Sequence, residues 1–422
     1  MEFVVTTLSS YVLSFKRFTS HRSYKRLLLG GFVSGLGDRI SYLAFLAAVA
    51  SKTDDAMAIG GLTISEMLPG IVALPFVSYI VDRFDKRRLL FASDIFRAVV
   101  FLLAAMSGEI WMFFACGFIS SCFTMLFEPA RMALEPHYIP EGEILQANGT
   151  RQSMMSLVMV IGPALGGVLV ATVGFRTAFI VNSITFLVSA WLVRGLDRIP
   201  LNLNKRTDGF WKEITGGMAA VRSSHVLMYL FALMAFFHLA IGIQFPLMFV
   251  FIKENLGGSA TTTGWLFSAI GVGGIVAGAI LASIPKARTP FEVTSTSGRR
   301  KIAALAAIDG VVVIAFASLH SIPPVLIIFA LFGAIGVCLM VAYNTAVTEQ
   351  THEAVRGRVF SLYHAIQGPL LVISIAIGTP LARKYGAANV FYASGGLEVL
   401  LGTVAFLLAG KIKQKVLLIS SR

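Results

Sequence analysis

Long stretches without a single charged residue recur along this 422-residue chain. A helix needs about 20 mainly apolar residues to cross the roughly 30 Å hydrocarbon layer of a bilayer. The stretches are about that long, and they do not show the alternating segments of about ten residues that are typical of a transmembrane barrel. Because backbone polar groups in lipid must be bonded within the segment, the pattern predicts membrane-spanning helices. The uncharged stretches are 110–127, 152–175, 177–193, 255–285, 310–348 and 359–382.

The hydropathy pattern predicts twelve crossings. The stretch 310–348 is long enough for two of them, with His320, Pro323 and Pro324 marking the turn. The fold class is therefore expected to be all-α and integral to a lipid bilayer. The expected helices are 27–51, 57–81, 89–108, 110–133, 147–172, 175–195, 225–252, 262–285, 301–320, 323–346, 359–382 and 388–410.

The positive charges indicate which loops face the cytoplasm. Cytoplasmic loops of membrane proteins carry an excess of Lys and Arg. Most of the 35 lysines and arginines lie before the first helix, in alternate loops and after the last helix, and Arg39 and Arg97 lie within helices. We therefore expect a multi-pass protein with both termini in the cytoplasm. The loops on the other side hold only Lys52, Arg176, Lys253, Arg383 and Lys384.

Composition narrows the possible functions. Only 14% of the residues are charged, against about 25% in a soluble domain. A net charge of +13 would favour nucleic-acid binding in a soluble protein, but here the basic residues lie in alternate loops, so we expect no nucleic-acid partner. The three cysteines lie in apolar runs without disulfide or metal-ligand spacing. No phosphate-binding loop GxxxxGK[ST] or nucleophile pattern is present. We expect no enzyme activity, cofactor or metal site.

A basic loop separates the predicted helices into two sets of six. The sets are weakly similar: Gly162-Pro163 in the fifth helix matches Gly368-Pro369 in the eleventh. Parallel six-helix repeats predict a substrate site at their interface and alternation between two facings. The predicted divisions are an N-terminal cytoplasmic extension at 1–24 that lies on the membrane surface, a first bundle at 25–195, a cytoplasmic linker at 196–224, a second bundle at 225–410 and a cytoplasmic tail at 411–422.

The loop after the second predicted helix carries a recognisable motif. It reads Ser78-Tyr-Ile-Val-Asp82-Arg83-Phe-Asp85-Lys86-Arg87-Arg88. It resembles the major facilitator superfamily motif G-x-L-A-D-R-x-G-R-R/K, with serine and aspartate in place of the two glycines. A carboxylate at a helix end can pair with basic residues or with a neighbouring helix N-terminus. The resemblance implies that Asp82, Arg83, Lys86 and Arg87 tie helices of the first half together in one conformational state.

Two further segments support the resemblance. Gly162-Pro163-Ala-Leu-Gly166-Gly167 is similar to the core of the superfamily's antiporter motif, although the expected preceding glycine is Val158 here. Glycines at this spacing let helix backbones approach closely, so generic packing is the alternative. The segment ending in Arg356-Gly-Arg358-Val is similar to the subgroup of the enterobactin exporter and macrolide efflux proteins. The resemblance covers about residues 25–410. It implies two pseudo-symmetric six-helix bundles in a bacterial inner membrane.

Ionisable side chains at membrane depth are costly and therefore mark functional candidates. Asp38 and Arg39 lie near the middle of the first predicted helix, and Glu66 lies about a third of the way into the second. We expect Asp38 and Glu66 to be the proton-coupling residues. A purely structural pairing of Asp38 with Glu66 or Arg97 is the alternative.

Two acid–base pairs lie nearer the cytoplasmic ends of the helices. Asp94 and Arg97 are three residues apart, so they share one face of the third helix. Glu128 and Arg131 have the same spacing at the end of the fourth helix. We expect both pairs to brace the cytoplasmic side and to take part in the conformational change.

The resemblance implies that the first and seventh helices line the substrate cavity, and the eleventh offers further polar groups. A lone histidine in a membrane helix is equally explained as a hydrogen-bonded packing residue. Asp309 and Glu398 are the remaining acids within helices of the second half, and Glu398 lies in a helix that is often peripheral in this fold. The predicted substrate-binding residues are Asp38, Arg39, Tyr42, Phe45, His238, Gln244, His364 and Gln367.

These features predict a secondary active transporter that exports a small amphipathic molecule, drug-like or siderophore-like, by proton antiport and alternating access. It is expected to act as a monomer, with the small molecule and protons as its partners. Two other functions remain open: a lysophospholipid flippase of the same fold, and a non-transporting membrane receptor or scaffold. The sequence does not set the direction of transport, because the same cycle runs either way.

Overall fold

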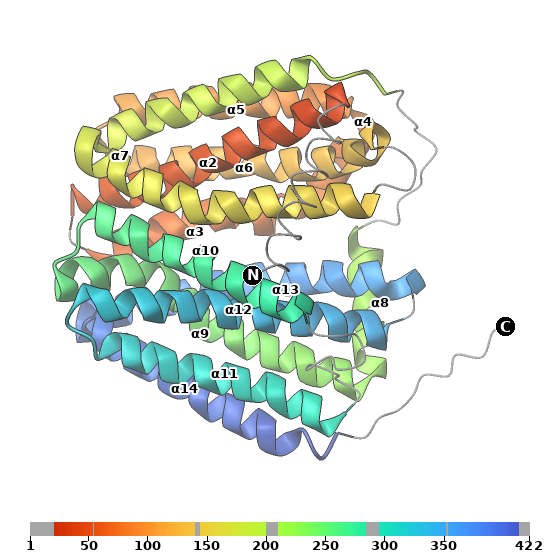
Figure 1. Cartoon of the computed structure of the whole chain (residues 1–422), viewed down its shortest axis with the longest axis vertical. Helices are drawn as coiled ribbons and strands as arrows, with labels where there is room; N and C mark the ends of the chain where they lie inside the picture. The colour runs from red at the N-terminus through yellow and green to blue at the C-terminus, as the bar shows by residue number, and fades with distance from the viewer. Residues whose placement is uncertain are drawn as a thin grey trace. The chain divides into compact units, whose positions relative to one another are not determined.

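The computed structural model describes residues 21–53, 55–139, 144–199, 210–283, 295–351 and 353–412 (Figure 1). The described residues form helices and no strand, which confirms the predicted all-α fold class. The helices are α2 (Arg22–Ala50), α3 (Ala56–Val72), α4 (Leu74–Arg83), α5 (Lys86–Met106), α6 (Ile110–Leu134), the 3₁₀ helix η1 (Glu135–Tyr138), α7 (Ile144–Arg194), α8 (Phe210–Ser223), α9 (His225–Leu256), α10 (Ala260–Ser283), α11 (Thr296–Ala317), α12 (Ile322–Gln350), α13 (Glu353–Tyr385) and α14 (Ala387–Leu408).

The helices supply the twelve predicted crossings. Nine stretches of the described residues are long and apolar enough to span a membrane. One of them, Thr150–Arg194, is interrupted at Gly174, where φ is 82° and ψ is 165°. Glycine adopts this backbone conformation readily, and the chain turns back there, so α7 supplies two crossings (Figure 1). The pair α3–α4 and helix α11 complete the twelve.

The second predicted crossing, 57–81, is not one continuous helix. The structure divides it into α3 and α4, which meet at Ala73. Pro69 lies inside α3, and a second proline begins α4. Proline has no backbone N–H and its ring clashes with the preceding turn, so it breaks or bends a helix. The kink separates the outer part of this crossing from the loop that carries the basic motif.

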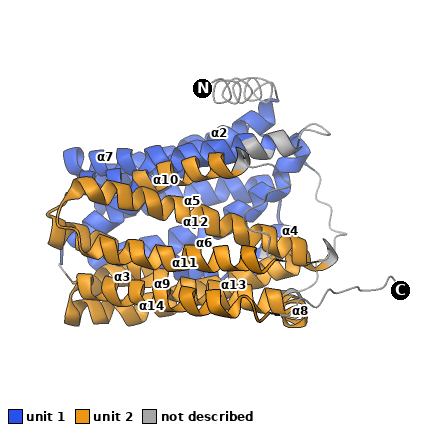
Figure 2. Ribbon diagram, turned by 60° about the horizontal axis from the view of Figure 1, so that its bottom comes forward, with its two compact units in different colours: residues 1–54, 65–206, 259–268 blue, residues 55–64, 207–258, 269–422 orange. Residues whose placement is uncertain are grey.

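The described residues divide into two compact units (Figure 2). Unit 1 comprises residues 1–54, 65–206 and 259–268, and unit 2 comprises residues 55–64, 207–258 and 269–422. Unit 1 therefore contains the helices of the first predicted half together with the beginning of α10. Unit 2 contains those of the second half together with the beginning of α3. The division cuts through α3 and α10 and does not follow the predicted linker.

Aromatic rings from four helices fill the core of unit 1. The centroid of the Phe45 ring on α2 lies 4.7 Å from that of Phe179 on α7 and 5.6 Å from that of Phe101 on α5. Tilted and edge-on pairs of this kind add about 0.5–1.5 kcal/mol each beyond the burial of their area. Helices α2 and α7 approach so closely that a Cβ on Gly166 would lie 2.9 Å from the Cα of Ile40. The core thus fixes α2 against α5 and α7.

A second aromatic cluster lies in unit 2. The Phe316 ring on α11 has its centroid 4.6 Å from that of Phe251 on α9 and 5.1 Å from that of Phe391 on α14. The backbones of α11 and α14 are in contact, because a Cβ on Gly402 would lie 2.6 Å from the backbone nitrogen of Ala307. Helices α9, α11 and α14 therefore form one tightly packed group.

The predicted linker 196–224 contains a helix that the sequence pattern did not predict. Helix α8 occupies residues Phe210–Ser223 and packs against α13. The contact is close, since a Cβ on Gly216 would lie 2.9 Å from the Cδ of Arg358. Residues 200–209 of the linker lie outside the described residues, as do residues 1–20 of the predicted extension and 413–422 of the predicted tail.

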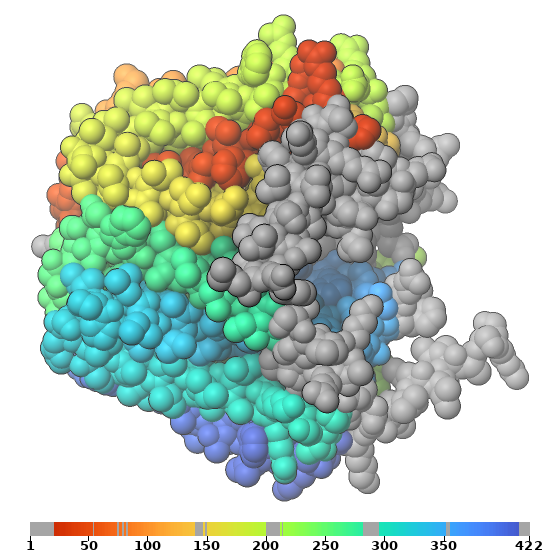
Figure 3. Space-filling view, in the orientation of Figure 1, coloured from red at the N-terminus to blue at the C-terminus, as the bar shows by residue number. Residues whose placement is uncertain are grey.

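The outer surfaces of the helices are strongly apolar. Large side chains such as Trp111, Trp191, Ile327 and Leu407 are exposed over 65%, 73%, 66% and 65% of their area. Figure 3 shows one face of this surface in the colours of the chain. Exposed apolar area on this scale is unfavourable in water, whereas the hydrocarbon chains of lipids can contact it without that cost. The surface therefore supports the membrane location that the hydropathy pattern predicts.

We expect the close approach of α11 and α14 to be sensitive to added volume. Gly402→Val should lower the free energy of unfolding in detergent by about 1–3 kcal/mol, because the new side chain meets the backbone of α11. Gly396→Val on the same helix is the matched control, since nothing lies within 4 Å of a Cβ there. Thermal unfolding of both variants measures the difference, and equal losses of stability would contradict this packing.

Candidate functional site

A buried ion pair on α5 is the centre of the candidate site in unit 1. Asp94 and Arg97 lie one turn apart, and Nη2 of Arg97 donates to Oδ1 of Asp94 at 2.6 Å. Only 2% of the Arg97 side chain and none of the Asp94 side chain is exposed. The shared helix face predicted from their spacing is therefore present. Two charges in contact offset much of the cost of burying each one.

Arg97 is also held from its sides. Its guanidinium carbon lies 4.1 Å from the ring centroid of Phe186 on α7 and 4.8 Å from that of Phe127 on α6. Its Nη1 donates to Oγ1 of Thr124 on α6 at 3.4 Å. Cation–π contacts of this kind stabilise a cation by about 2 kcal/mol when water is excluded. The guanidinium thus joins α5, α6 and α7 around one positive charge.

Asp38 on α2 is the accessible acid beside this buried pair. Its Oδ2 lies 3.8 Å from Nη1 of Arg97, and 41% of its side chain is exposed. The structural pairing of Asp38 with Arg97, which the sequence left as an alternative, is therefore present. Asp38 is thus partly exposed, whereas Asp94 is sealed in the core.

Glu66 on α3 is the second acid near Asp38. The two carboxyl groups interact electrostatically, and Glu66 also interacts with Tyr42. The stem of Glu66 packs on α6, because a Cβ on Gly117 would lie 3.0 Å from its Cγ. The Tyr42 ring makes an edge-on contact with Phe267, with a centroid distance of 6.3 Å. The structure thus brings Asp38, Tyr42 and Glu66 close to one another.

The glycine motif of α7 lies against the same part of α2. A Cβ on Gly162 would lie 2.6 Å from the Cβ of Arg39, and one on Gly167 would lie 2.9 Å from the Cα of Gly264 on α10. Thr261 donates its hydroxyl to the carbonyl oxygen of Gly167 at 3.2 Å. Pro163 is part of this helical stretch. The motif therefore holds α7 between α2 and the beginning of α10 within unit 1.

A charge network lies at the C-terminal end of α6. Arg131 contacts Glu128 at 2.6 Å and Glu135 at 3.2 Å, and Nε of Arg151 on α7 lies 3.4 Å from Oε1 of Glu135. Sequence reasoning predicted Glu128 and Arg131 but missed Glu135. Its spacing of four residues from Arg131 is a signal that could have found it. The network joins α6, η1 and α7, as expected of a bracing element.

The basic loop motif caps one helix and contacts another. Oδ1 of Asp85 accepts hydrogen bonds from the backbone nitrogens of Arg87 and Arg88, at 2.9 and 3.2 Å, at the start of α5. The guanidinium of Arg87 donates to the carbonyl oxygen of Arg194 at the end of α7. Arg83 is exposed and Lys86 is half-buried. The side chain of Asp82 lies outside the described residues.

The predicted cavity residues of unit 2 do not form one cluster. His238 is buried, with Nδ1 2.7 Å from the carbonyl oxygen of Met234 and Nε2 3.4 Å from the hydroxyl of Tyr363. Gln244 is buried and bonds to α14, whereas His364 is exposed and Gln367 is half-buried. In unit 1, Phe45 is 2% exposed and packs against Phe101 and Phe179 in the aromatic core, so its ring does not line a cavity in this structure.

The arginines that open α13 contact neighbouring helices. Nη2 of Arg356 donates to the carbonyl oxygen of Thr348 at the end of α12, at 3.2 Å. Arg358 packs against Gly216 of α8. Among the described residues, no group of three or more His, Cys, Asp or Glu side chains is arranged to hold a metal ion.

The order of helices and the position of the basic loop motif agree with one family. A model of the Major Facilitator Superfamily matches residues 27–293 and 230–417. The chain belongs to this superfamily. Its members are transporters and span the membrane many times, so the predicted membrane transport class is confirmed.

Relatives within the superfamily include efflux proteins. The uncharacterized MFS-type transporter YfiS of Bacillus subtilis is 24% identical over 397 residues, which cover 92% of this chain and 94% of YfiS. The multidrug efflux pump Tap of Mycobacterium tuberculosis is 24% identical over 401 residues, or 90% and 91% of the two chains. Macrolide efflux protein A of Streptococcus pyogenes is 28% identical over 231 residues, or 52% and 56%. The predicted resemblance to macrolide efflux proteins is confirmed.

Solved structures share the fold across nearly the whole chain. A bacterial homologue of the iron transporter ferroportin has a TM-score of 0.73 at 14% identity and covers 92% of this chain and 98% of its own. A mutant of the nucleoside transporter NupG has a TM-score of 0.72 at 13% identity, with 92% and 99% covered. At these identities the likeness shows the superfamily fold alone.

We expect Asp94 to be essential for the stability of unit 1. Asp94→Asn should destabilise the protein by about 3–5 kcal/mol, because Arg97 would remain buried with only the more distant carboxylate of Asp38. The control is Arg383→Met, which breaks the exposed pair with Asp55 and should cost about 0–1 kcal/mol. Thermal unfolding in detergent distinguishes the two, and similar effects in both variants would contradict the central place of Asp94.

Proposed function

We propose that this superfamily member is a secondary transporter that exports a small amphipathic molecule in exchange for protons. The observation that carries the proposal is the partly exposed carboxylate of Asp38, which lies 3.8 Å from a buried arginine that already has a partner. An acid at membrane depth is kept at a cost in stability, which marks it as a functional residue. The named efflux proteins among the relatives support the direction of transport.

Competition for Arg97 gives Asp38 two states. When Asp38 is ionised, it attracts Arg97 and draws its charge toward α2. When Asp38 takes up a proton, that attraction ends, and Arg97 keeps only its contacts with Asp94, Thr124, Phe127 and Phe186. A proton on Asp38 therefore changes the contact between α2 and α5, and binding that favours one contact shifts the population toward one facing of the transporter.

The surroundings of Asp38 indicate the kind of substrate. Two acids, Asp38 and Glu66, lie near the aromatic side chain of Tyr42, which contacts Phe267. Carboxylates and aromatic faces both attract cations. A cationic amphipathic molecule and a proton would neutralise the same carboxylates, so each would displace the other, and exchange follows from this competition. The site favours the drug-like, cationic part of the predicted range over an acidic siderophore.

The proposed orientation follows the basic loops. The end of the molecule that carries the loop 83–88 and the Arg131 network faces the cytoplasm, and both termini lie on that side. Protons then enter from the outside, where they are more available, and the substrate leaves in the opposite direction. The proposed transporter acts as a monomer in the inner membrane of a bacterium.

Replacement of Asp38 tests the coupling directly. Asp38→Asn should abolish proton flux driven by the dye ethidium or the macrolide erythromycin in proteoliposomes, because the amide cannot take up a proton. Insertion and thermal stability should stay close to wild type, since the side chain is partly exposed and its ion-pair contact with Arg97 is long, at 3.8 Å. Asp55→Asn, which alters an acid outside the site, is the matched control and should keep full flux.

Two results would overturn the proposal. Flux in the Asp38→Asn variant equal to wild type would remove Asp38 from the coupling mechanism. Movement of labelled lysophospholipid without any proton flux would instead favour the flippase function.

Labelling of single cysteines tests the proposed orientation in the membrane. In a background without the native cysteines, Lys52→Cys should react with a membrane-impermeant maleimide added outside intact cells, and Arg88→Cys should react only after the cells are opened. Both positions are exposed in the structure, so a difference in labelling reports the side of the membrane. Labelling of Arg88→Cys from outside would reverse the proposed topology.

A further inference from the structure

Two buried acids meet in unit 2, far along the chain from the candidate site. Asp309 lies on α11 and Glu398 on α14, and each is only 3% exposed. Gly310, the residue after Asp309, packs directly against Glu398, and the two acids interact electrostatically. Two ionised carboxylates cannot hydrogen-bond, since neither has a donor, and their repulsion is strong where water is excluded. A proton on one of the two groups would remove this repulsion and supply the donor for a hydrogen bond between them.

Small residues create this contact. A Cβ on Gly310, the residue after Asp309, would lie 2.5 Å from the carbonyl oxygen of Gly395 and 2.8 Å from the Cβ of Glu398. Larger residues at these positions would hold α11 and α14 apart. The helices are packed closely where the acids lie, so the pair belongs to the native packing of unit 2.

An amide from a third helix binds one side of the pair. Nε2 of Gln244 on α9, which is 1% exposed, donates to Oε1 of Glu398 at 2.7 Å and to the hydroxyl of Ser394 at 3.3 Å. In the described part of the chain, Oε2 of Glu398 is buried and accepts no hydrogen bond from a protein N–H or O–H group. The amide thus occupies one oxygen of the carboxylate and leaves the other as an acceptor for a proton.

The Lys, Arg and His side chains of the surrounding helices lie away from the Asp309–Glu398 pair or contact other groups. On α11, Arg299, Arg300 and Lys301 occupy the first two turns, at least about 12 Å from Asp309 along the axis, and Arg299 donates to the carbonyl oxygen of Ala409. On α9, His238 contacts Met234 and Tyr363, and Lys253 lies more than two turns beyond Gln244. The remaining bases of the packed helices lie near helix ends or contact other groups: Arg356, Arg358, His364, Arg383 and Lys384 on α13.

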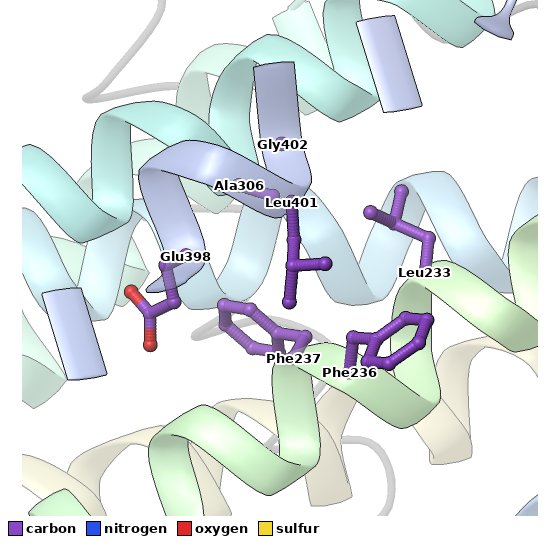
Figure 4. Close-up of a pocket in the computed structure, with 7 residues that line it drawn as sticks. All are labelled: Leu233, Phe236, Phe237, Ala306, Glu398, Leu401 and Gly402. Atoms are coloured by element: carbon purple, nitrogen blue, oxygen red, sulfur yellow. The ribbon is translucent and has the colours of Figure 1, made fainter. Parts of the chain in front are cut away.

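The space beside Glu398 is apolar. Figure 4 shows its carboxyl at one side of a small pocket whose other walls include Leu233, Phe236, Phe237 and Leu401. Such walls offer no hydrogen bonds to water or to a hydrated ion. A bare proton needs no such space, whereas a cation such as Na⁺ would need several oxygen ligands around it.

We propose that Asp309 and Glu398 form a proton-binding site that holds one proton between two carboxyl groups, and that Gln244 links this site to α9. Binding the proton forms an O–H bond on one carboxyl and a hydrogen bond to the other. Its loss leaves two negative charges in contact, which forces the carboxyls apart and alters the bond that Gln244 donates. The role of this site in the transport cycle rests on the proposed proton exchange, but proton binding itself does not.

Infrared spectroscopy of the purified full chain tests the site without any substrate. Between about pH 5 and pH 9, the wild type should show a protonated-carboxyl band whose intensity changes with pH. Asp309→Asn and Glu398→Gln should each remove the same part of that change, because both groups are needed to share the proton, while the part that comes from Asp38 and Glu66 remains. Glu109→Gln, which removes an exposed acid at the start of α6, is the matched control and should leave the band intact.

The double variant Asp309→Asn/Glu398→Gln covers the case in which a single variant fails to fold. Its two amides can hydrogen-bond without a proton, so it should fold, and its melting temperature should lose the pH dependence that the wild type shows over the same range. Three results would overturn the proposal: a titrating band that neither single variant reduces, two independent bands that each variant removes separately, or a reduced band component that responds to Na⁺ at constant pH.

The same preparations separate this inference from the proposed function. The Asp38→Asn variant should keep the carboxyl band of the Asp309–Glu398 pair while its ethidium-driven proton flux is lost. If the wild type shows the carboxyl band of this pair but no substrate-driven proton flux, the protein binds the proton without exchanging it for these substrates. In that case the proposed function fails and the proton-binding site stands.

Discussion

A charged group in hydrocarbon must be neutralised by a partner or by a proton, and the interior of this protein is organised around that constraint. In unit 1 the partner is a cation: Arg97 balances Asp94 and lies close to Asp38. Aromatic rings on α6 and α7 complete its surroundings, so three helices converge on one guanidinium. The position of Asp38 on α2 therefore depends on the positive charge of Arg97, which is already paired with Asp94.

Unit 2 meets the same constraint without a cation. Asp309 and Glu398 lie together with an amide as their only polar partner from α9. The two predicted halves of the sequence are weakly similar. They nevertheless differ in how they neutralise their buried acids. An acid held by arginine can stay ionised, whereas two acids held by each other respond to the supply of protons. The pseudo-symmetric fold thus contains two chemically different charge sites.

Hydropathy was enough to predict the fold, because crossing a bilayer imposes length and composition on every helix. Spacing within one helix was equally informative, and it placed Asp94 and Arg97 on a common face. Spacing within a helix does not predict contacts between helices. Gln244 and Glu398 lie in different helices, and neither segment contains a signal that they form a hydrogen bond. Phe45 was expected in the cavity, but its orientation is decided by rings on three neighbouring helices. Helix α8 was missed because its mixed composition is typical of a loop.

The setting of Arg97 also limits which sequences this site can accept. Its planar guanidinium lies near the rings of Phe186 and Phe127 while its edge faces Asp94 and Asp38. Lysine carries the same charge, but as a compact ammonium without a plane or a fork of donors. It would satisfy one carboxylate at a time and lose the stacking. Natural variation at this position should therefore exclude lysine, and change here is expected only together with Asp94 and the flanking phenylalanines.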